Sequence, residues 1–526
     1  MDAGQESCTK RARASADINN TRRRRKENWS MGKLYTVGNG VKMRFDDGAV
    51  TFYSDGGTLW PDWLETSNIN RREVKSIRVA EGTVFLPEDS SGFNLNTWHC
   101  TMFGGLYQVE SIDMNGFDTS QVTDMSSMFY DCSKLITLDL KAFNTTCVKD
   151  MNGMFKECQS LTDLDLSSFN TSRVTDMNDM FSNCYSLTNL DLSRFDTSNV
   201  IDMCWMFCNC HAMTHLDLNS FDTSRVTNMQ KMFRNCNGLT DLDLSSFDTS
   251  RVTNMNEMFY NCHSLTGLDL SNFDTSNVTN MRSMFAECKS LTSLNIKKMN
   301  THRVTDMGFM FTRCKELTSL DLSGFNTSNV TDMSRMFSEC SGLKELDVKS
   351  FDTSHVIDMR GMFEYCGNLT RLNLNHFDTS KVTNMACMFI DCKNLTHLDL
   401  NNFDTSRVTD VNDMFCNCSS LTNLDLSSFD TSKITDMGGM FFGCESLEAL
   451  NISGFNTSRV VNMGGMFEGC RTIQDLDLSG FDTSNVTNMG SMFRNCANLR
   501  QIALNPVIGQ NTKTEGMFDG CQPGII

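Results

Sequence analysis

The sequence predicts an α/β repeat solenoid, in which each coil adds a strand to a parallel sheet on one face and a short helix on the other. A motif of constant length carries this prediction: residues 161–186 read LTDLDLSSFNTSRVTDMNDMFSNCYS, and similar segments recur about fifteen times. Cysteines mark the period, because they stand 26 residues apart from Cys132 to Cys496 without a slip. A fixed period of this length is typical of a solenoid, which stacks each repeat on its neighbours.

Each repeat begins with an expected half-buried strand. In residues 187–192, LTNLDL, Leu190 and Leu192 alternate with Asp191, which is the period-two pattern of a strand with one buried face. The Asp, Thr and Ser that follow Phe195 favour a turn, because their side chains hydrogen-bond to nearby backbone. We therefore expect successive strands to pair in parallel.

A short helix is expected after this turn. In the copy at residues 174–184, apolar side chains at positions 177, 180, 181 and 184 are spaced as one face of a helix. Thr175 is the expected N-cap, and Asp176 stands in the first turn beside the positive end of the helix dipole.

Positions that never vary indicate the core. The Met and Phe equivalent to Met180 and Phe181 occur in every repeat and predict a core stripe. The repeated cysteines stand singly, not in pairs, so we predict buried, reduced thiols in place of a disulfide framework. The cluster of Cys204, Cys208, Cys210 and His211 could suggest zinc, but the absence of a second ligand pair favours a structural interpretation.

Charge is distributed unevenly. The chain has a net charge of -18, yet residues 1–33 carry nine Lys or Arg against four acids. An acidic array of this size argues against a nucleic-acid partner. Residues 1–33 contain no apolar segment that would make a signal peptide or membrane span, so no membrane insertion is expected. A disordered tail is predicted there, with a targeting or polyanion-binding patch at residues 22–26 as the alternative.

The domain organisation follows from these patterns. Alternating polar and apolar residues around Gly-containing turns, together with Trp60, Trp63 and Trp98, predict a small β-rich cap of hairpins that covers the first coil. The predicted units are a disordered basic tail at 1–33, the N-terminal cap at 34–98, the solenoid at 99–498, and a degenerate C-terminal coil and cap at 499–526.

Two outward positions of the strand segment form the candidate binding face. One is nearly always Asp, as at Asp191, and its neighbour varies, as at His215. Mixed side chains on a rigid framework are typical of a binding surface, although any exposed position varies in the same way. The candidate binding residues are Asp163, Asp191, His215, Asp243, Asp269, Glu345, Arg371, His397 and Asp425.

The outward Asp position has an electrostatic consequence. Carboxylates on strands about 4.8 Å apart repel by about 0.9 kcal/mol even in water. Dominant repulsion would raise the pKa of these carboxyls, so changing Asp243 and Asp269 together to Asn is expected to be neutral or stabilising at pH 7. Hydrogen bonds, bound calcium or a cationic partner would offset the repulsion, and plain solvation screened by salt is the simpler alternative. Calcium is the only cofactor hypothesis that the sequence supports.

Catalytic chemistry is not indicated. Eight histidines fall at several repeat positions and form no constellation with a nucleophile. We find no glycine-rich phosphate loop between a strand and a helix, and no His pair with metal-ligand spacing. The chain is predicted not to be an enzyme.

Residues 421–446, LTNLDLSSFDTSKITDMGGMFFGCES, resemble the repeat of the BspA-like leucine-rich-repeat surface proteins of bacteria, catalogued as a mycoplasma-type domain of unknown function. The resemblance covers roughly residues 99–522, and residues 74–93 resemble the segment that introduces such arrays. It implies leucine-rich-repeat-like coils in an adhesin-like protein that is secreted or at the cell surface and binds a protein or glycan.

Two other functions remain consistent with the sequence. A structural spacer would set distance from a surface and bind nothing specific. An intracellular interaction scaffold would account for the free thiols and for an N-terminal segment without a signal-peptide pattern, which leaves a cytoplasmic location open.

Overall fold

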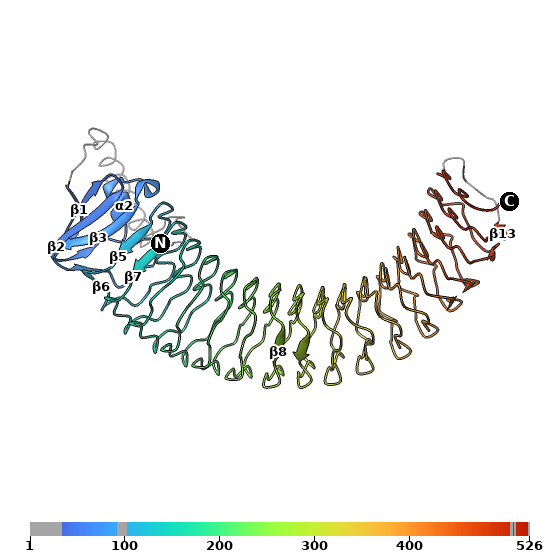
Figure 1. Ribbon diagram of the computed structural model, residues 1–526, viewed down its shortest axis with the longest axis horizontal. Coiled ribbons are helices and arrows are strands. Elements are labelled where there is room, and N and C mark those ends of the chain that lie inside the picture. The colour runs from blue at the N-terminus through green and yellow to red at the C-terminus, as the bar shows by residue number, and fades with distance from the viewer. Residues whose placement is uncertain (1–33, 92–101, 505–508, 510–511, 524–526) are drawn as a thin grey trace, which may run out of the picture.

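The computed structural model is an open arc of stacked coils that begins with a β-rich cap (Figure 1). It describes residues 34–91, 102–504, 509 and 512–523. The predicted tail at 1–33, Trp98 and the predicted boundary between residues 98 and 99 lie outside the described residues.

A β-hairpin opens the cap. β1 (Leu34–Asp46) and β2 (Ala49–Leu59) pair antiparallel on either side of Asp47 and Gly48. These turn residues have φ values of 45° and 86°, and two positive φ values characterise the tight turn that fits the twist of paired strands. The predicted hairpin around a Gly-containing turn is confirmed.

Parallel pairing joins the cap to the first coils. β2 pairs with both β3 and β4, β3 pairs with β5, β4 pairs with β6, and β5 pairs with β7. The elements after the hairpin are α2 (Trp63–Ser67), η1 (Arg71–Glu73), β3 (Ser76–Glu81), β4 (Val84–Phe85), β5 (Ser111–Asp113), β6 (Phe117–Asp118) and β7 (Thr137–Asp139).

Trp63 closes the first coil. Its side chain is fully buried, and its Nε1 donates to the carbonyl of Met102 at 3.0 Å. Its ring lies 6.4 Å from that of Phe103, which stacks on Phe129 at 5.8 Å. The aromatic cluster of the cap is therefore continuous with a column of rings in the array.

The apolar positions of the repeat fill the interior of every coil. Met180 and Phe181 are fully buried, and the Phe181 ring stacks on Phe155 and Phe207 at 5.7 and 5.8 Å. The predicted Met and Phe core stripe is confirmed. The other buried apolar residues of the coil at 161–186 are Leu161, Leu164, Leu166, Phe169, Val174, Met177 and Cys184.

The short helices predicted for the opposite face are wrong, because consecutive turns occupy that segment. The N–H groups of Asp179 and Asn183 donate to Cys204 and Cys208 of the next coil, at 2.9 and 2.8 Å. In a helix these N–H groups would donate to carbonyls four residues earlier. Beyond α2 and η1, the described part of the chain contains no helix.

Thr175 is correspondingly not an N-cap. Its hydroxyl donates to the carbonyl of Lys149 in the preceding coil at 3.2 Å. Asp176, expected in a first helical turn, makes parallel backbone bridges with Asp150 and Asp202. Such single bridges continue from coil to coil and form the longest ladder in the array.

Two residues of each turn segment adopt the left-handed conformation. In the coil at 161–186 these are Asp179 and Asn183, with φ values of 59° and 63°. The turns close through bonds from Met180 N to Met177 O and from Cys184 N to Phe181 O, at 3.3 and 3.2 Å. Turns with a left-handed third residue favour Gly or Asn there; Gly and Asp recur at both positions, and Asn recurs at the second.

The predicted parallel sheet is confirmed only for some coils. The strand segments pair in parallel in β8 with β9, β10 with β11, and β12 with β13. Between other coils single bonds remain, such as Thr188 N to Thr162 O at 3.2 Å. The strand bounds are β8 (Gly267–Asp269), β9 (Ser293–Asn295), β10 (Asn423–Asp425), β11 (Ala449–Asn451), β12 (Asp475–Leu478) and β13 (Gln501–Leu504).

A ladder of buried threonines ties the coils together. Thr197 is 1% exposed, accepts from Asp222 N at 2.8 Å and donates to Asp222 O at 2.9 Å. One hydroxyl therefore satisfies the N–H and the carbonyl of a single residue in the next coil. Thr171 makes the same two bonds to Asp196.

The repeated cysteines are buried, as predicted. The Cys184 thiol donates to the carbonyl of Phe155 in the preceding coil at 3.2 Å, and burial raises its pKa to about 12. A thiol of this pKa has almost no reactive thiolate near neutral pH.

Thiol titration tests this arrangement. Denatured protein prepared without reductant is expected to show nearly all 23 cysteines as free thiols, whereas the native array reacts slowly because its thiols are buried and protonated. Disulfides between neighbouring coils in the native protein would contradict the prediction.

Candidate functional site

The exposed strand segments form one candidate surface, the strand face, at the positions of Asp163 and Asp165 in every coil. All nine predicted binding residues lie on it with exposed side chains. The structure brings some together, since Arg371 and His397 form a backbone bridge on adjacent coils. A hollow of about 510 Å³ lies beside His397 and Asp425. The others are spread along the arc, and their binding role stays a prediction.

The outward aspartates are held by specific donors. Asp243 accepts from the N–H of Ser245 at 2.9 Å, and the N–H and hydroxyl of Ser245 lower its pKa. Asp269 is bound in the same way by Ser271, and Asn295 adds a bond at 2.9 Å. The pKa values of Asp243 and Asp269 are thus lowered, not raised as dominant repulsion would require, because local hydrogen bonds outweigh repulsion between coils.

Changing Asp243 and Asp269 together to Asn is now expected to lower the free energy of unfolding at pH 7. Their lowered folded-state pKa means that the carboxylates stabilise the fold above the unfolded pKa, and this contribution is lost as pH falls through the folded pKa. Asn still accepts from Ser N–H but without charge. Urea unfolding at pH 7 and about pH 2 should show the loss only at pH 7; equal curves at pH 7 would contradict it.

Asp150 should respond in the opposite direction. Burial raises its pKa to about 6, and Asp124 and Asp176 add to the rise. Protonated Asp150 therefore favours folding below the unfolded pKa, and this advantage is lost as pH rises through about 6. Changing Asp150 to Asn should raise the free energy of unfolding by about 1 kcal/mol at pH 8, allowing for its partial exposure, and by little at pH 4.

Urea unfolding at both pH values measures this difference. Asn is a suitable replacement because Asn228 occupies the same position and accepts from Gln230 N at 3.1 Å, as Asp150 does from Asn152 N at 2.9 Å. Destabilisation at pH 8 would show that the charge itself is required.

A second surface, the turn face, comprises the positions of Asp179, Ser182 and Asn183 in every coil. The first and third of these positions, those of Asp179 and Asn183, have left-handed backbone. This conformation costs a residue other than Gly about 1–2 kcal/mol. The last coils place Gly439, Gly443, Gly465 and Gly469 there. Central coils instead carry large side chains at these positions: Trp205, Lys231, Phe309, Arg313, Arg335 and Tyr365.

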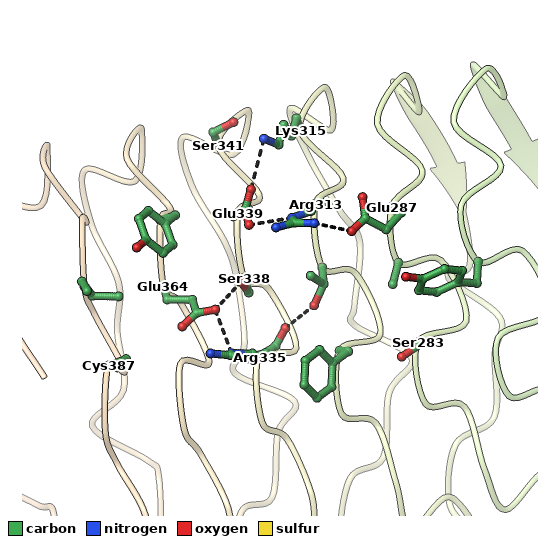
Figure 2. Close-up of a pocket in the computed structure, with 16 residues that line it drawn as sticks. Ser283, Glu287, Arg313, Lys315, Arg335, Ser338, Glu339, Ser341, Glu364 and Cys387 are labelled. Atoms are coloured by element: carbon green, nitrogen blue, oxygen red, sulfur yellow. Dashed lines mark hydrogen bonds and ion pairs between the residues drawn. The ribbon is translucent and has the colours of Figure 1, made fainter. Parts of the chain in front are cut away.

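Four of these large side chains line a hollow of about 750 Å³ on the turn face, namely Phe309, Arg313, Arg335 and Tyr365 (Figure 2). Arg313 lies between Glu287 and Glu339, with each pair at 2.6 Å. Arg335 contacts Glu364 at 2.9 Å, and Glu364 also accepts from the Ser338 hydroxyl at 2.7 Å. The charged groups of the hollow are thus fixed in place before any partner arrives.

Hydrogen bonds set the ionisation of this cluster. Burial opposes the charge of Glu339, but bonds from Arg313 and Lys315 outweigh it and lower the pKa. Glu339 and Glu287 in turn raise the pKa of Arg313. Both partners therefore stay charged at neutral pH.

Aromatic rings on the turn face are covered by cations. Lys231 lies 4.2 Å from the centre of the Trp205 ring, and Arg234 lies 4.4 Å from that of Tyr260. Tyr365 is 45% exposed and lines the hollow. Sequence reasoning missed this surface, because its positions vary and were assigned to a helix; the Gly and Asn at the same positions were the available signal.

We searched the described residues for side-chain clusters that could bind a metal ion. In the ranges that the structure describes, no group of three or more His, Cys, Asp or Glu side chains is arranged to hold a metal ion. His211, from the cysteine cluster considered for zinc, stacks on Tyr185 at 5.1 Å. Calcium binding by the outward aspartates stays a hypothesis.

Three solved structures of low identity resemble the chain. A leucine-rich repeat protein from Eubacterium ventriosum is 14% identical, with a TM-score of 0.26, and 94% of this chain and 95% of that chain are covered. A leucine-rich cell surface protein from Faecalibacterium prausnitzii is 14% identical, with a TM-score of 0.20 and coverage of 90% and 90%. The functional domain of InlJ from Listeria monocytogenes, described as including a cysteine ladder, is 16% identical, with a TM-score of 0.18 and coverage of 70% and 67%. No curated protein matches the chain.

Stacked coils with a Leu-lined strand segment define a repeat solenoid of the leucine-rich-repeat class. The chain belongs to the family described as "Mycoplasma protein of unknown function, DUF285", which matches residues 99–215, 186–269, 263–346, 339–428 and 417–523. The finer BspA-like assignment remains a prediction. No helix in the described residues is both long and apolar enough to cross a bilayer.

Proposed function

We propose that this protein is a non-enzymatic scaffold that binds another protein through the turn face. Supporting this is the placement of aromatic and arginine side chains at left-handed positions around the hollow, at a cost of about 1–2 kcal/mol each. Most other coils carry Gly, Asn, Asp, Ser or Glu at these left-handed positions, so bulky side chains held there are a reason to infer function. Trp, Tyr and Arg dominate the binding energy of protein interfaces.

The finer proposal is an adhesin-like role at the bacterial cell surface, with a protein or glycan partner. The resemblance to BspA-like surface proteins supports it. The strand face is the second candidate surface, because a hollow lies beside His397 and Asp425. Surface labelling of native cells tests the location independently of any partner.

A variant in which the large turn-face residues are replaced by the residues at equivalent positions of other coils tests binding through the turn face. The variant changes Phe309 and Arg335 to Ser, and Arg313 and Tyr365 to Asn, because Ser283 and Asn261 stand at these two positions elsewhere. Glu287 and Glu339 keep Lys289 and Lys315 as partners. Glu364 is 7% exposed and keeps only the Ser338 hydroxyl when Arg335 is removed, so urea unfolding is used to confirm that the variant is folded. Its binding to immobilised collagen, laminin or fibronectin is expected to weaken at least tenfold.

A matched strand-face variant provides the control. It changes Glu345 and Arg371 to Ser, and His397 and Asp425 to Asn, again following other coils, and it should bind within twofold of the unaltered protein. Loss of binding in this variant alone would move the site to the strand face. Absence of binding to every matrix protein would favour the structural spacer.

A further inference from the structure

A row of cations follows one edge of the array. It occupies the position of Arg173 in each coil, three residues after the turn Asp or Asn, and is termed the basic stripe. Other coils carry Asn, Gln or Cys there and never an acid, although the whole chain has a net charge of -18. The basic members of the stripe are Arg173, Arg225, Arg251, Arg303, His355, Lys381, Arg407, Lys433 and Arg459.

The Lys and Arg side chains of the stripe form no ion pairs in the described part of the chain. Within the described residues, no Lys or Arg of the stripe has a carboxylate oxygen within 4.0 Å. On the turn face, by contrast, Lys156, Arg313 and Arg335 all form ion pairs. All but one of the stripe's Lys and Arg side chains are exposed, and Lys381 is partly exposed. The stripe is therefore a row of largely exposed cations that form no ion pair within 4.0 Å with any described residue.

Asn residues orient part of the stripe. Asn199 donates through Nδ2 to the carbonyl of Ser172 at 2.9 Å, which directs its Oδ1 toward the next coil. There Arg225 donates to that oxygen at 2.6 Å. Asn277 and Arg303 repeat the arrangement at 3.0 Å. These guanidinium groups are positioned by a neutral acceptor that leaves their charge available.

Carboxylates stand three residues before several stripe positions in the same loop, but they do not form ion pairs with the stripe's Lys and Arg side chains. Asp248 accepts from the N–H of Ser250 at 2.9 Å, and Asp430 accepts from that of Ser432 at 2.9 Å. Both are short side chains held against their own turn, whereas Arg and Lys extend further and carry their charge at the tip. Hydrogen bonds from the same serines, and with them the charges of Arg251 and Lys433, lower the pKa values of these two exposed carboxyls. The acidic and basic columns therefore lie side by side, with the cations on the longer side chains.

We propose that the basic stripe binds a linear sulfated polysaccharide. Cations repeat once per coil from Lys381 to Arg459, at a spacing set by stacked strands of about 5 Å, and the planar fork of Arg fits oxyanions such as sulfate. The positions beside the stripe, such as the partly exposed Ser172 and the exposed Thr175, supply hydroxyls for sugars. No Phe, Trp or Tyr stands at these flanking positions, so single-stranded nucleic acid would lack a stacking platform.

Fluorescence anisotropy with a labelled heparin dodecasaccharide tests the proposal on the full chain. The stripe variant changes Lys381, Arg407, Lys433 and Arg459 to Asn, the residue that other coils carry at this position. The control variant removes four cations on or beside the strand face, by changing Lys298, Lys349 and Arg371 to Ser and Lys344 to Thr, which also follows other coils. The two variants have equal net charge.

The unaltered chain is expected to bind heparin at least tenfold tighter than desulfated heparin of the same length, with affinity falling as NaCl rises. The stripe variant should bind at least tenfold more weakly than the control variant. Equal affinities of the two variants, or no preference for sulfate, would overturn the proposal. Equally tight binding of a dT oligonucleotide that the stripe variant also loses would overturn it in favour of nucleic acid. The outcome is independent of the turn-face test, which alters other residues.

Discussion

Changing Phe311 to Ala is expected to lower the free energy of unfolding by about 3–5 kcal/mol. The ring is fully buried and stacks between Phe285 and Phe337, at 5.7 and 5.6 Å. Its removal leaves a cavity between three coils that the backbone bonds on either side prevent from closing. Urea unfolding followed by circular dichroism measures the loss.

The array offers a matched control and a second readout for this change. Phe442 is only partly buried on the turn face, so its change to Ala should cost much less. Because each coil contacts only its neighbours, the weakened interface is expected to separate unfolding into two transitions. A single transition with an unchanged midpoint would show that Phe311 does not pack as described.

Changing Thr197 to Val should cost about 2–4 kcal/mol, because it removes two hydrogen bonds without changing the shape of the side chain. The N–H and the carbonyl of Asp222 both lose their bonds to the Thr197 hydroxyl, which is itself buried at 1% exposure. Unfolding in urea again measures the cost.

Thr227 provides the comparison for the threonine ladder. Its hydroxyl donates to Ile201 O at 3.3 Å, but its side chain is exposed. Water can replace this bond, so Thr227→Val should change the free energy of unfolding by less than about 1 kcal/mol. Equal effects of the two substitutions would mean that the buried ladder does not contribute as proposed.

The period, the core stripe and the direction of pairing could be predicted because stacking repeats the same contacts in every coil. Met180 and Phe181 recur without exception, and only an interior position shared by all coils imposes that constraint. Helix and turn could not be separated in the same way. The apolar spacing at positions 177, 180, 181 and 184 fits both a helix and consecutive turns, because either conformation places these side chains on the same, inward-facing side.

Backbone conformation also explains why the turn face could not be predicted. Phe309 and Arg335 are unremarkable as exposed residues of a helix, but they are costly at φ values of 61° and 53°. Their significance depends on knowing that the positions are left-handed. The strand-face residues were correctly placed at the surface, because alternation alone separates Leu164 from Asp163 and Asp165.

Bonding from one coil to the next also has a mechanical consequence. Tension applied to the two ends would load the backbone and threonine bonds between neighbouring coils, and the weakest terminal interface would yield first. Each released coil of 26 residues frees roughly 90 Å of chain while the rest of the arc stays folded. Under a pulling force the array would lengthen in equal steps and dissipate work at each step. Stepwise unfolding would therefore limit the peak force on the contact with a bound partner.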